Sequence, residues 1–214
     1  LVTVRYQGDV MLKRFLREAQ SAASVRAPNV VDVLDYGQDA AGNPYLVMEL
    51  LEGESLDARV RVGDFTVEEA LGWFDHALVG LTAIHDAGIV HRDLKPANLF
   101  LANTLRDGLP ATLVKVVDFG IARPAAPDAS ALTHTMQTLG TPHYMSPEQV
   151  RSAKNVDARS DVYAMGVILY QLLTGRLPFE GPSATAIIAA IVTDDPTPLR
   201  TLSPAIPVLI ARVV

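Results

Sequence analysis

The sequence predicts an α+β fold, with a small β-rich lobe followed by a larger and mainly helical lobe. Two observations carry this prediction. Short runs of β-branched and apolar residues, with one helical segment among them, make up residues 1–52. Apolar side chains at helical spacing dominate residues 53–214. We therefore predict one lobe over each of these two ranges.

The composition is that of a globular protein of 214 residues, with 49% hydrophobic and 20% charged residues. The net charge of −6 does not favour a nucleic-acid partner. The chain has no cysteine, which excludes disulfides and thiolate metal sites and suits a reducing compartment. No apolar run reaches the roughly 18 to 20 residues of a membrane span. We expect a cytoplasmic location. The alternative is a full-length protein that is anchored in a membrane through segments outside this chain.

Three strands and one helix are expected in the small lobe. Residues 2–4 form a short β-branched run, and residues 30–36 and 44–50 predict two further strands. Turn-forming residues at 39–43 connect these two strands. A helix is predicted over residues 10–25, from apolar side chains at helical spacing. These are Leu12, Phe15, Leu16, Ala19 and Ala23.

The clearest helix of the larger lobe is predicted over residues 66–87. Thr66 and Glu69 have the spacing of a capping box, in which each side chain binds a free backbone N–H of the other. Gly88 suits the left-handed turn that ends a helix. One face is expected to be buried through Ala70, Phe74, Ala77, Leu78, Leu81 and Ile84.

Strands and further helices follow this helix. Short strands are predicted around residues 99–101 and 114–117. Residues 123–147 are rich in Pro, Thr, Ser and Ala and predict a long loop, which in a compact domain is usually functional. The chain from Ser160 onward is expected to be helical.

Two short segments concentrate the residues that carry chemistry. Residues 91–98 are His-Arg-Asp-Leu-Lys-Pro-Ala-Asn, and Asp118-Phe119-Gly120 follows an apolar strand. These segments resemble the catalytic loop and the metal-binding motif of the eukaryotic-like (Hanks-type) protein kinase family, in its bacterial Ser/Thr branch. The resemblance implies a protein kinase-like bilobal fold, with ATP and Mg²⁺ (or Mn²⁺) as cofactors.

The resemblance assigns a role to each polar side chain of these segments. Asp93 would orient a substrate hydroxyl and accept its proton, and Lys95 would offset charge on the transferred phosphoryl group. Asn98 and Asp118 carry oxygens suited to Mg²⁺, which bridges the phosphates of ATP. Phe119 would pack in the core and fix the position of Asp118.

The segment at 140–148 resembles the end of the family's activation segment, with Ser146 at the position of the commoner Ala. Thr141 would hydrogen-bond toward Asp93 and Lys95, which implies protein substrates with Ser or Thr hydroxyls.

Regulation by phosphorylation is implied by Arg92, because an arginine before the catalytic aspartate marks kinases that are switched in this way. Arginine can clamp the charge of a phosphate. Thr133 and Thr135 best match the autophosphorylation sites of the bacterial branch. Self-association for autophosphorylation is therefore expected.

Residues 45–53 resemble the strand and hinge that hold adenine in the family. Met48 would lie at the back of the nucleotide pocket, and backbone groups from Glu49 to Leu51 would bind the base. Glu18 fits the helix glutamate that pairs with a nucleotide-positioning lysine. Asp161, at the start of a segment that resembles the family's central buried helix, would accept hydrogen bonds from the catalytic-loop backbone.

The chain departs from the family pattern at both ends, which predicts a truncated catalytic domain with an incomplete small lobe. Residues 1–40 contain no Gly-x-Gly-x-x-Gly loop. Arg5 stands where the family has its strand lysine, and Lys13 is expected on the exposed side of the helix. Glu148 lacks the later arginine that pairs with it in the family. We therefore expect Glu148 to be unpaired and to reduce stability.

Three functions are compatible with these residues. The leading hypothesis is a Ser/Thr protein kinase that transfers the γ-phosphoryl group of ATP. The alternative is a kinase-like nucleotide-binding module without catalysis, either a pseudokinase or an inactive fragment. The absent lysine and glycine loop favour this alternative, and the presence of Asp93, Asn98 and Asp118 argues against it. The third is a small-molecule phosphotransferase of related fold, which Arg92 and the segment at 140–148 disfavour.

Overall fold

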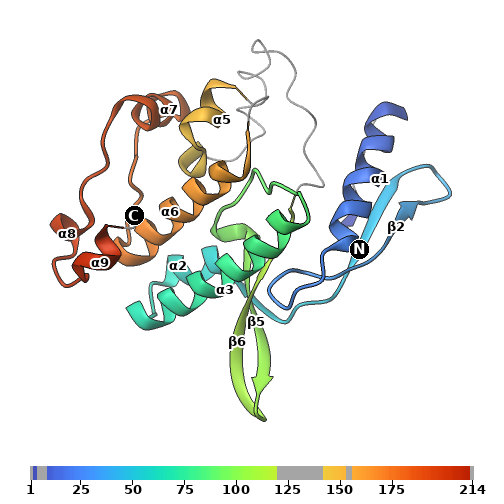
Figure 1. Cartoon of the computed structure of the whole chain (residues 1–214), viewed down its shortest axis with the longest axis horizontal. Coiled ribbons are helices and arrows are strands. Elements are labelled where there is room, and N and C mark those ends of the chain that lie inside the picture. Colours follow the sequence, from blue (N-terminus) through green and yellow to red (C-terminus); the bar gives the residue numbers. More distant parts are fainter. Residues whose placement is uncertain (1, 4–8, 120–141, 153–155, 213–214) are drawn as a thin grey trace.

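A small antiparallel sheet with one helix lies beside a larger helical lobe, as Figure 1 shows. The computed structural model describes residues 2–3, 9–119, 142–152 and 156–212. The predicted α+β class is confirmed. The predicted lobe boundary between residues 52 and 53 coincides with the start of β4 (Gly53–Ser55), and it stays a prediction.

The sheet of the small lobe has the strand order β1 (Val2–Thr3), β3 (Pro44–Met48), β2 (Val33–Gln38), and all pairs are antiparallel. Helix α1 (Asp9–Ser24) contacts both β2 and β3. Phe15, Ala19 and Ala22 are its buried residues in the main core. The predicted helix is therefore confirmed to within one residue at each end.

The turn between β2 and β3 follows the predicted chemistry. The Asp39 carboxylate accepts hydrogen bonds from the backbone N–H groups of Ala41 (2.9 Å) and Asn43 (2.8 Å). A register shift between Val33 and Asp35 interrupts the pairing of β2 with β3. Leu34, which lies at this irregularity, is 64% exposed.

A second antiparallel sheet belongs to the larger lobe, with the order β4, β5 (Leu99–Arg106), β6 (Leu109–Val116). The strands β5 and β6 are longer than predicted and form a hairpin that extends away from the helices (Figure 1). Asp107 and Gly108 at its tip have positive φ values of 54° and 79°. Two adjacent positive φ values are typical of the type I′ turns that join such hairpins.

Helix α3 (Val67–Asp86) starts and ends as predicted. Thr66 and Glu69 form the capping box. After the helix, Gly88 N–H donates to the His85 carbonyl (2.8 Å) and Ile89 N–H to the Ile84 carbonyl (3.1 Å), the two bonds of a Schellman motif.

The buried face of α3 differs from the prediction at Phe74, which is only half-buried, and at two further positions. Leu78 was expected in the core, but this side chain is 38% exposed, so the prediction is wrong there. Trp73 is buried instead, and its ring lies 5.4 Å from that of Phe65, centroid to centroid.

The other elements of the larger lobe are helical. They are α2 (Leu56–Val62), the 3₁₀ turns η1 (Pro96–Asn98) and η3 (Pro142–Tyr144), α5 (Pro147–Arg151), α6 (Ala158–Thr174), α7 (Ala184–Thr193), α8 (Leu199–Leu202) and α9 (Val208–Ala211). Helix α6 packs against α3, and its Met165 and Ile168 belong to the main core. None of the described helices is long and apolar enough to cross a membrane.

The small lobe is joined to the larger one through β6. Val31 N–H donates to the Val116 carbonyl (3.0 Å), and Val116 N–H donates to the Asn29 carbonyl (2.8 Å). Helix α3 approaches this junction at Gly80, where a Cβ atom would lie only 2.4 Å from the Asn29 carbonyl oxygen. One core cluster therefore includes residues of both lobes.

Replacing Gly53 with Ala is expected to lower the free energy of unfolding by about 2 to 4 kcal/mol. Gly53 has a φ of 139°, and a Cβ atom there would lie 2.0 Å from the Leu101 carbonyl oxygen. Gly63 is the matched control: its φ is 72°, but no heavy atom lies within 4 Å of the added Cβ. Gly63→Ala should cost only about 1 kcal/mol. Urea unfolding of both variants measures the difference, and equal losses would contradict the steric argument.

Candidate active site

The backbone of the segment at 91–98 is held by a buried carboxylate from α6. Asp161 is 1% exposed and accepts hydrogen bonds from the N–H groups of His91 and Arg92, each at 2.8 Å. The expected contact of Asp161 with this loop is therefore confirmed. The ring of His85, which the sequence analysis missed, adds a third contact from α3 at 2.8 Å. Several partners are what a buried carboxylate requires.

His91 is buried and links two parts of the site. Its Nδ1 accepts the N–H of Asp93 (3.3 Å), and its Nε2 lies 3.1 Å from the carbonyl of Val117, the residue before Asp118. Because Nδ1 is an acceptor, Nε2 carries the ring proton and donates a hydrogen bond to that carbonyl. Burial lowers the pKa of His91 below its ordinary value, although the nearby Asp161 carboxylate opposes the shift.

The neutral His91 is expected to make stability depend on pH. When the pH falls below about 6.5, the unfolded chain binds a proton at His91 and the folded chain does not. The free energy of unfolding should then fall by up to about 1.4 kcal/mol per pH unit through this group. Urea unfolding from about pH 7.5 to about pH 5.5 tests it against His91→Gln, which should lose less stability over this range. Equal losses in both proteins would contradict the argument.

Asp93, Lys95 and Asn98 lie together in the loop. Lys95 Nζ is 2.9 Å from Asp93 Oδ2, and both side chains are about a third exposed. Asn98 is buried, and its Nδ2 donates to the Asp93 backbone carbonyl at 2.8 Å. The backbone carbonyl of Asn98 accepts the N–H of Val117 at 3.0 Å. The loop thus meets the end of β6 at the residue before Asp118.

Asp118 and Phe119 are adjacent in sequence but differ in burial. Asp118 is exposed, and Phe119 is 1% exposed and lies in the main core, as expected. The φ of Asp118 is 57°, in the left-handed region that non-glycine residues rarely adopt. Arg92 has a φ of 65°. Such backbone persists only where the surroundings hold it, and it concentrates at functional sites.

Asn98 and Asp118 carry side-chain oxygens of the kind that Mg²⁺ binds. Because Asn98 Nδ2 is occupied by the Asp93 carbonyl, the Oδ1 atom is the end of the amide suited to a metal. The Asp118 carboxylate is exposed. Within the described ranges, no three His, Cys, Asp or Glu side chains could hold a metal ion together. Mg²⁺ usually needs only one or two carboxylates when phosphates complete its coordination.

Glu49, in the segment that resembles the family's hinge, forms an ion pair with Lys115 that no sequence pattern marked. The Glu49 carboxylate accepts a hydrogen bond from Asp32 N–H (2.8 Å) and lies 2.6 Å from Lys115 Nζ in β6. Its backbone N–H donates to the Asp32 carbonyl (3.0 Å). The Glu49 side chain therefore ties the hinge to the larger lobe. Met48 and Leu51 are half-buried and pack against the core.

Glu18 lies on α1, half-buried, one residue before the buried Ala19. Lys13 is exposed, as predicted. The other residues expected to bind nucleotide, substrate or phosphate lie outside the described residues. These are Arg5, Thr133, Thr135 and Thr141.

The expectation that Glu148 is buried without a partner is wrong. Its Oε1 accepts the Ser160 hydroxyl (2.8 Å), which in turn accepts the Ser146 hydroxyl (3.1 Å). Although partial burial opposes it, hydrogen bonds from the Glu148 backbone N–H and from Ser160 lower the pKa of this carboxyl. Hydroxyl groups thus stabilise the carboxylate, and one of them is Ser146, which stands where the family commonly has Ala.

Tyr144 fastens η3 to the central helix. Its hydroxyl donates to Gln171 Oε1 of α6 at 2.7 Å. Burial, together with the Asp57 carboxylate nearby, raises the pKa of Tyr144 to about 12. The phenol therefore stays protonated and remains a donor at neutral pH.

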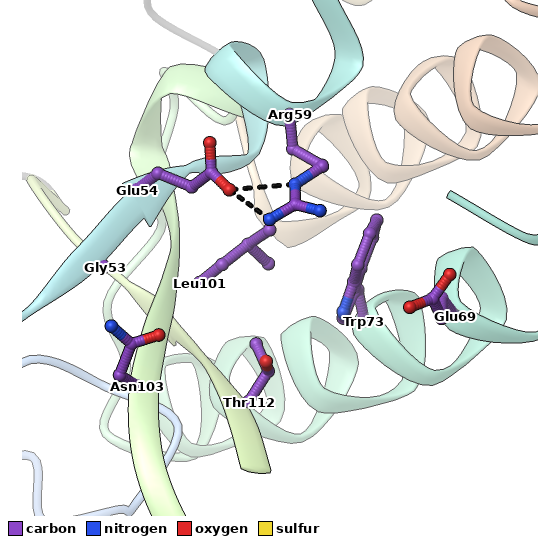
Figure 2. A pocket seen from close by; sticks show the side chains of 8 residues that line it. All are labelled: Gly53, Glu54, Arg59, Glu69, Trp73, Leu101, Asn103 and Thr112. Atoms are coloured by element: carbon purple, nitrogen blue, oxygen red, sulfur yellow. Dashed lines mark hydrogen bonds and ion pairs between the residues drawn. The ribbon is translucent and has the colours of Figure 1, made fainter. Parts of the chain in front are cut away.

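A separate cavity of about 350 Å³ lies between β4, β5, β6, α2 and α3 (Figure 2). An ion pair between Glu54 and Arg59 borders it on one side, and Trp73 lies on another. Its remaining lining residues are Gly53, Glu69, Leu101, Asn103 and Thr112. None of the predicted site residues lines this cavity, so it is distinct from the cluster around Asp93.

Comparison with known families finds a match to the model described as "Protein kinase domain" over residues 2–209. A probable serine/threonine-protein kinase PknB of Corynebacterium glutamicum is 45% identical over 190 residues, which cover 87% of this chain and 28% of the relative. The serine/threonine-protein kinase pkn2 of Myxococcus xanthus is 42% identical over 197 residues, covering 92% of this chain and 23% of the relative.

The serine/threonine-protein kinase PknB of Mycobacterium tuberculosis is 42% identical over 189 residues. That alignment covers 86% of this chain and 29% of the relative. The chain thus spans less than a third of the length of each of these three curated relatives.

Proposed function

This chain belongs to the protein kinase domain family, and on that basis we propose that the protein is an ATP-dependent Ser/Thr kinase. It transfers the γ-phosphoryl group of ATP to Ser and Thr hydroxyls of proteins. One observation carries the proposal. A continuous set of hydrogen bonds joins Asp93 to Asn98, and Asn98 to the residue before Asp118. The printed names of the relatives, all serine/threonine-protein kinases, also support it.

Asp93 is proposed as the residue that orients the substrate hydroxyl and accepts its proton. Its carboxylate is partly exposed and so is reachable by a substrate. Lys95 Nζ, 2.9 Å away, supplies positive charge next to the hydroxyl that attacks. Both effects act on the charge that develops during transfer, so they contribute through positioning and electrostatics. Thr141 is proposed to contact this pair from the substrate side.

Asn98 and Asp118 are proposed to hold Mg²⁺ or Mn²⁺ together with the phosphates of ATP. The ion would supply positive charge to the phosphate oxygens. Asn98 contributes a neutral oxygen from a buried and fixed amide, and Asp118 contributes a carboxylate at the solvent side. Phe119 is buried in the core, and it is proposed to fix the backbone that carries the Asp118 carboxylate.

The adenine of ATP is proposed to bind at the hinge. Met48 borders the back of this site, and backbone groups from Glu49 to Leu51 bind the base. The contacts of the Glu49 side chain with Asp32 and Lys115 support the role, because they fix the hinge backbone. Glu18 is proposed to form an ion pair with the lysine that positions the nucleotide.

Regulation, partners and location complete the proposal. We infer that Thr133 or Thr135 is phosphorylated and that Arg92 binds the phosphate, because arginine can clamp its charge. Such a reaction between two copies requires transient self-association. A cytoplasmic site of action suits a chain without cysteine and ATP as the substrate.

The test is phosphoryl transfer by the full-length protein with γ-labelled ATP and Mg²⁺, using the protein itself and a general protein substrate as acceptors. We expect phosphoserine and phosphothreonine, with phosphopeptides that include Thr133 or Thr135. Nucleotide binding without any transfer would favour a catalytically inactive module. Transfer confined to small molecules would contradict the protein-kinase assignment.

A further inference from the structure

Gln149, in the first turn of α5, uses both ends of its side-chain amide. Its Oε1 accepts the backbone N–H of Ser146 at 2.9 Å and so completes a capping box for α5. Its Nε2 donates to the backbone carbonyl of Arg92 at 2.8 Å. The second contact joins α5 to the loop that carries Asp93, and it has no part in capping.

The contact lies at a strained point of the loop. Arg92 has a φ of 65°, a left-handed conformation that an L-residue other than glycine rarely adopts. Its N–H is held by Asp161 and its carbonyl by Gln149, so anchors from two different helices fix the residue on both sides. Strained backbone persists where the surroundings over-determine it.

Gln149 is linked to Asp93 through a single peptide group. The Arg92 carbonyl and the Asp93 N–H belong to one peptide group, which is planar. Gln149 holds the carbonyl end at 2.8 Å, and His91 Nδ1 holds the N–H end at the longer distance of 3.3 Å. A rotation of this peptide group would turn the Cα–Cβ bond of Asp93 and move its carboxylate.

We propose that Gln149 is a positioning residue for Asp93: by holding the Arg92–Asp93 peptide group, it keeps the carboxylate oriented for transfer. The inference rests on the proposed kinase function. It assigns to the residue after Glu148 a role in the reaction, beyond the stability of α5. Misplacement of a catalytic group by about 1 Å can lower a rate by about 100-fold, so one anchoring bond is enough to matter.

Two variants separate positioning from capping. Gln149→Glu keeps an acceptor for Ser146 N–H, and Glu is a favoured residue at this place of a capping box. It replaces the Nε2 donor with a carboxylate oxygen that faces the Arg92 carbonyl. Ser146→Ala does the opposite: it removes the capping hydroxyl, which accepts Gln149 N–H at 3.3 Å, and leaves the Nε2 donor in place.

The experiment compares the full-length wild type with both variants and with Gln149→Met, which has a similar length but no amide. In Gln149→Glu and Gln149→Met we expect kcat to fall about 10- to 100-fold, with KM for ATP within about twofold. Ser146→Ala should keep kcat within about twofold. Amide hydrogen exchange at residues 91–94 should become faster in the two Gln149 variants and stay unchanged in Ser146→Ala.

If kcat and exchange are unchanged in both Gln149 variants, or if Ser146→Ala lowers kcat as much as they do, Gln149 acts only as a cap. If the wild type itself transfers no phosphate, the proposed function fails. The exchange comparison then still decides whether Gln149 holds the loop, because it requires no activity.

Discussion

Replacing Asp93 with Asn is expected to lower the rate of phosphoryl transfer by about 10³-fold, within the range for loss of a general base. The amide has the shape of the carboxylate but cannot accept the proton of a substrate hydroxyl. Folding should be nearly unaffected, because the ion pair with Lys95 is about one third exposed and such pairs contribute little to stability. Transfer by the full-length protein and a urea unfolding curve measure the two effects.

The matched control is Asp107→Asn at the tip of the β5–β6 hairpin. It makes the same chemical change at an exposed residue with a φ of 54°, which Asn tolerates well. We expect transfer at the wild-type rate. If Asp93→Asn also transferred phosphate at that rate, Asp93 would have no role in the reaction.

Replacing Asp161 with Ala is expected to have the largest effect on stability, a loss of about 3 to 5 kcal/mol in the free energy of unfolding. The change removes the acceptor of two backbone N–H groups, those of His91 and Arg92, and the partner of the His85 ring. The bond from His91 is buried and the other two are partly buried, so water replaces the lost hydrogen bonds only incompletely. Transfer should also be lost, because the loop that carries Asp93 is no longer anchored.

Asp157→Ala is the matched control, because it removes another carboxylate from the start of the same helix. Asp157 is the N-cap of α6, and its side chain accepts Arg159 N–H at 2.9 Å. Loss of an N-cap costs about 1 kcal/mol. If Asp161→Ala destabilised the protein no more than Asp157→Ala, Asp161 would be only a favourable charge at a helix start.

Local signals in the sequence predicted the elements that depend on local physics. The capping box of Thr66 and Glu69 and the glycine after α3 involve residues within a few positions of one another. The Asp-Gly pair at 107–108 is a signal of the same kind, and it would have predicted the longer β5–β6 hairpin. Leu78 shows the limit of periodicity, because spacing alone does not say how wide the buried face of a helix is.

The contacts that were missed all join distant segments. His85 reaches Asp161, Lys115 reaches Glu49, and Gln149 reaches the carbonyl of Arg92. None of these pairs has a spacing that marks it, since the partners meet only when the lobes and helices are packed. Asp93, Asn98 and Asp118 could be proposed as site residues from the sequence because they belong to short motifs. The residues that hold those motifs in place could be identified only in the folded chain.

We propose that Asn98 and Asp118 share one metal ion with a nucleotide whose reacting phosphate lies next to Asp93. The most direct measurement is a crystal structure of the protein with Mg²⁺ and a non-hydrolysable ATP analogue. We expect a metal bound by Asn98 Oδ1 and an Asp118 carboxylate oxygen at about 2.0 to 2.1 Å, with adenine at the hinge from Glu49 to Leu51. A nucleotide bound elsewhere, or a metal that touches neither side chain, would contradict the claim.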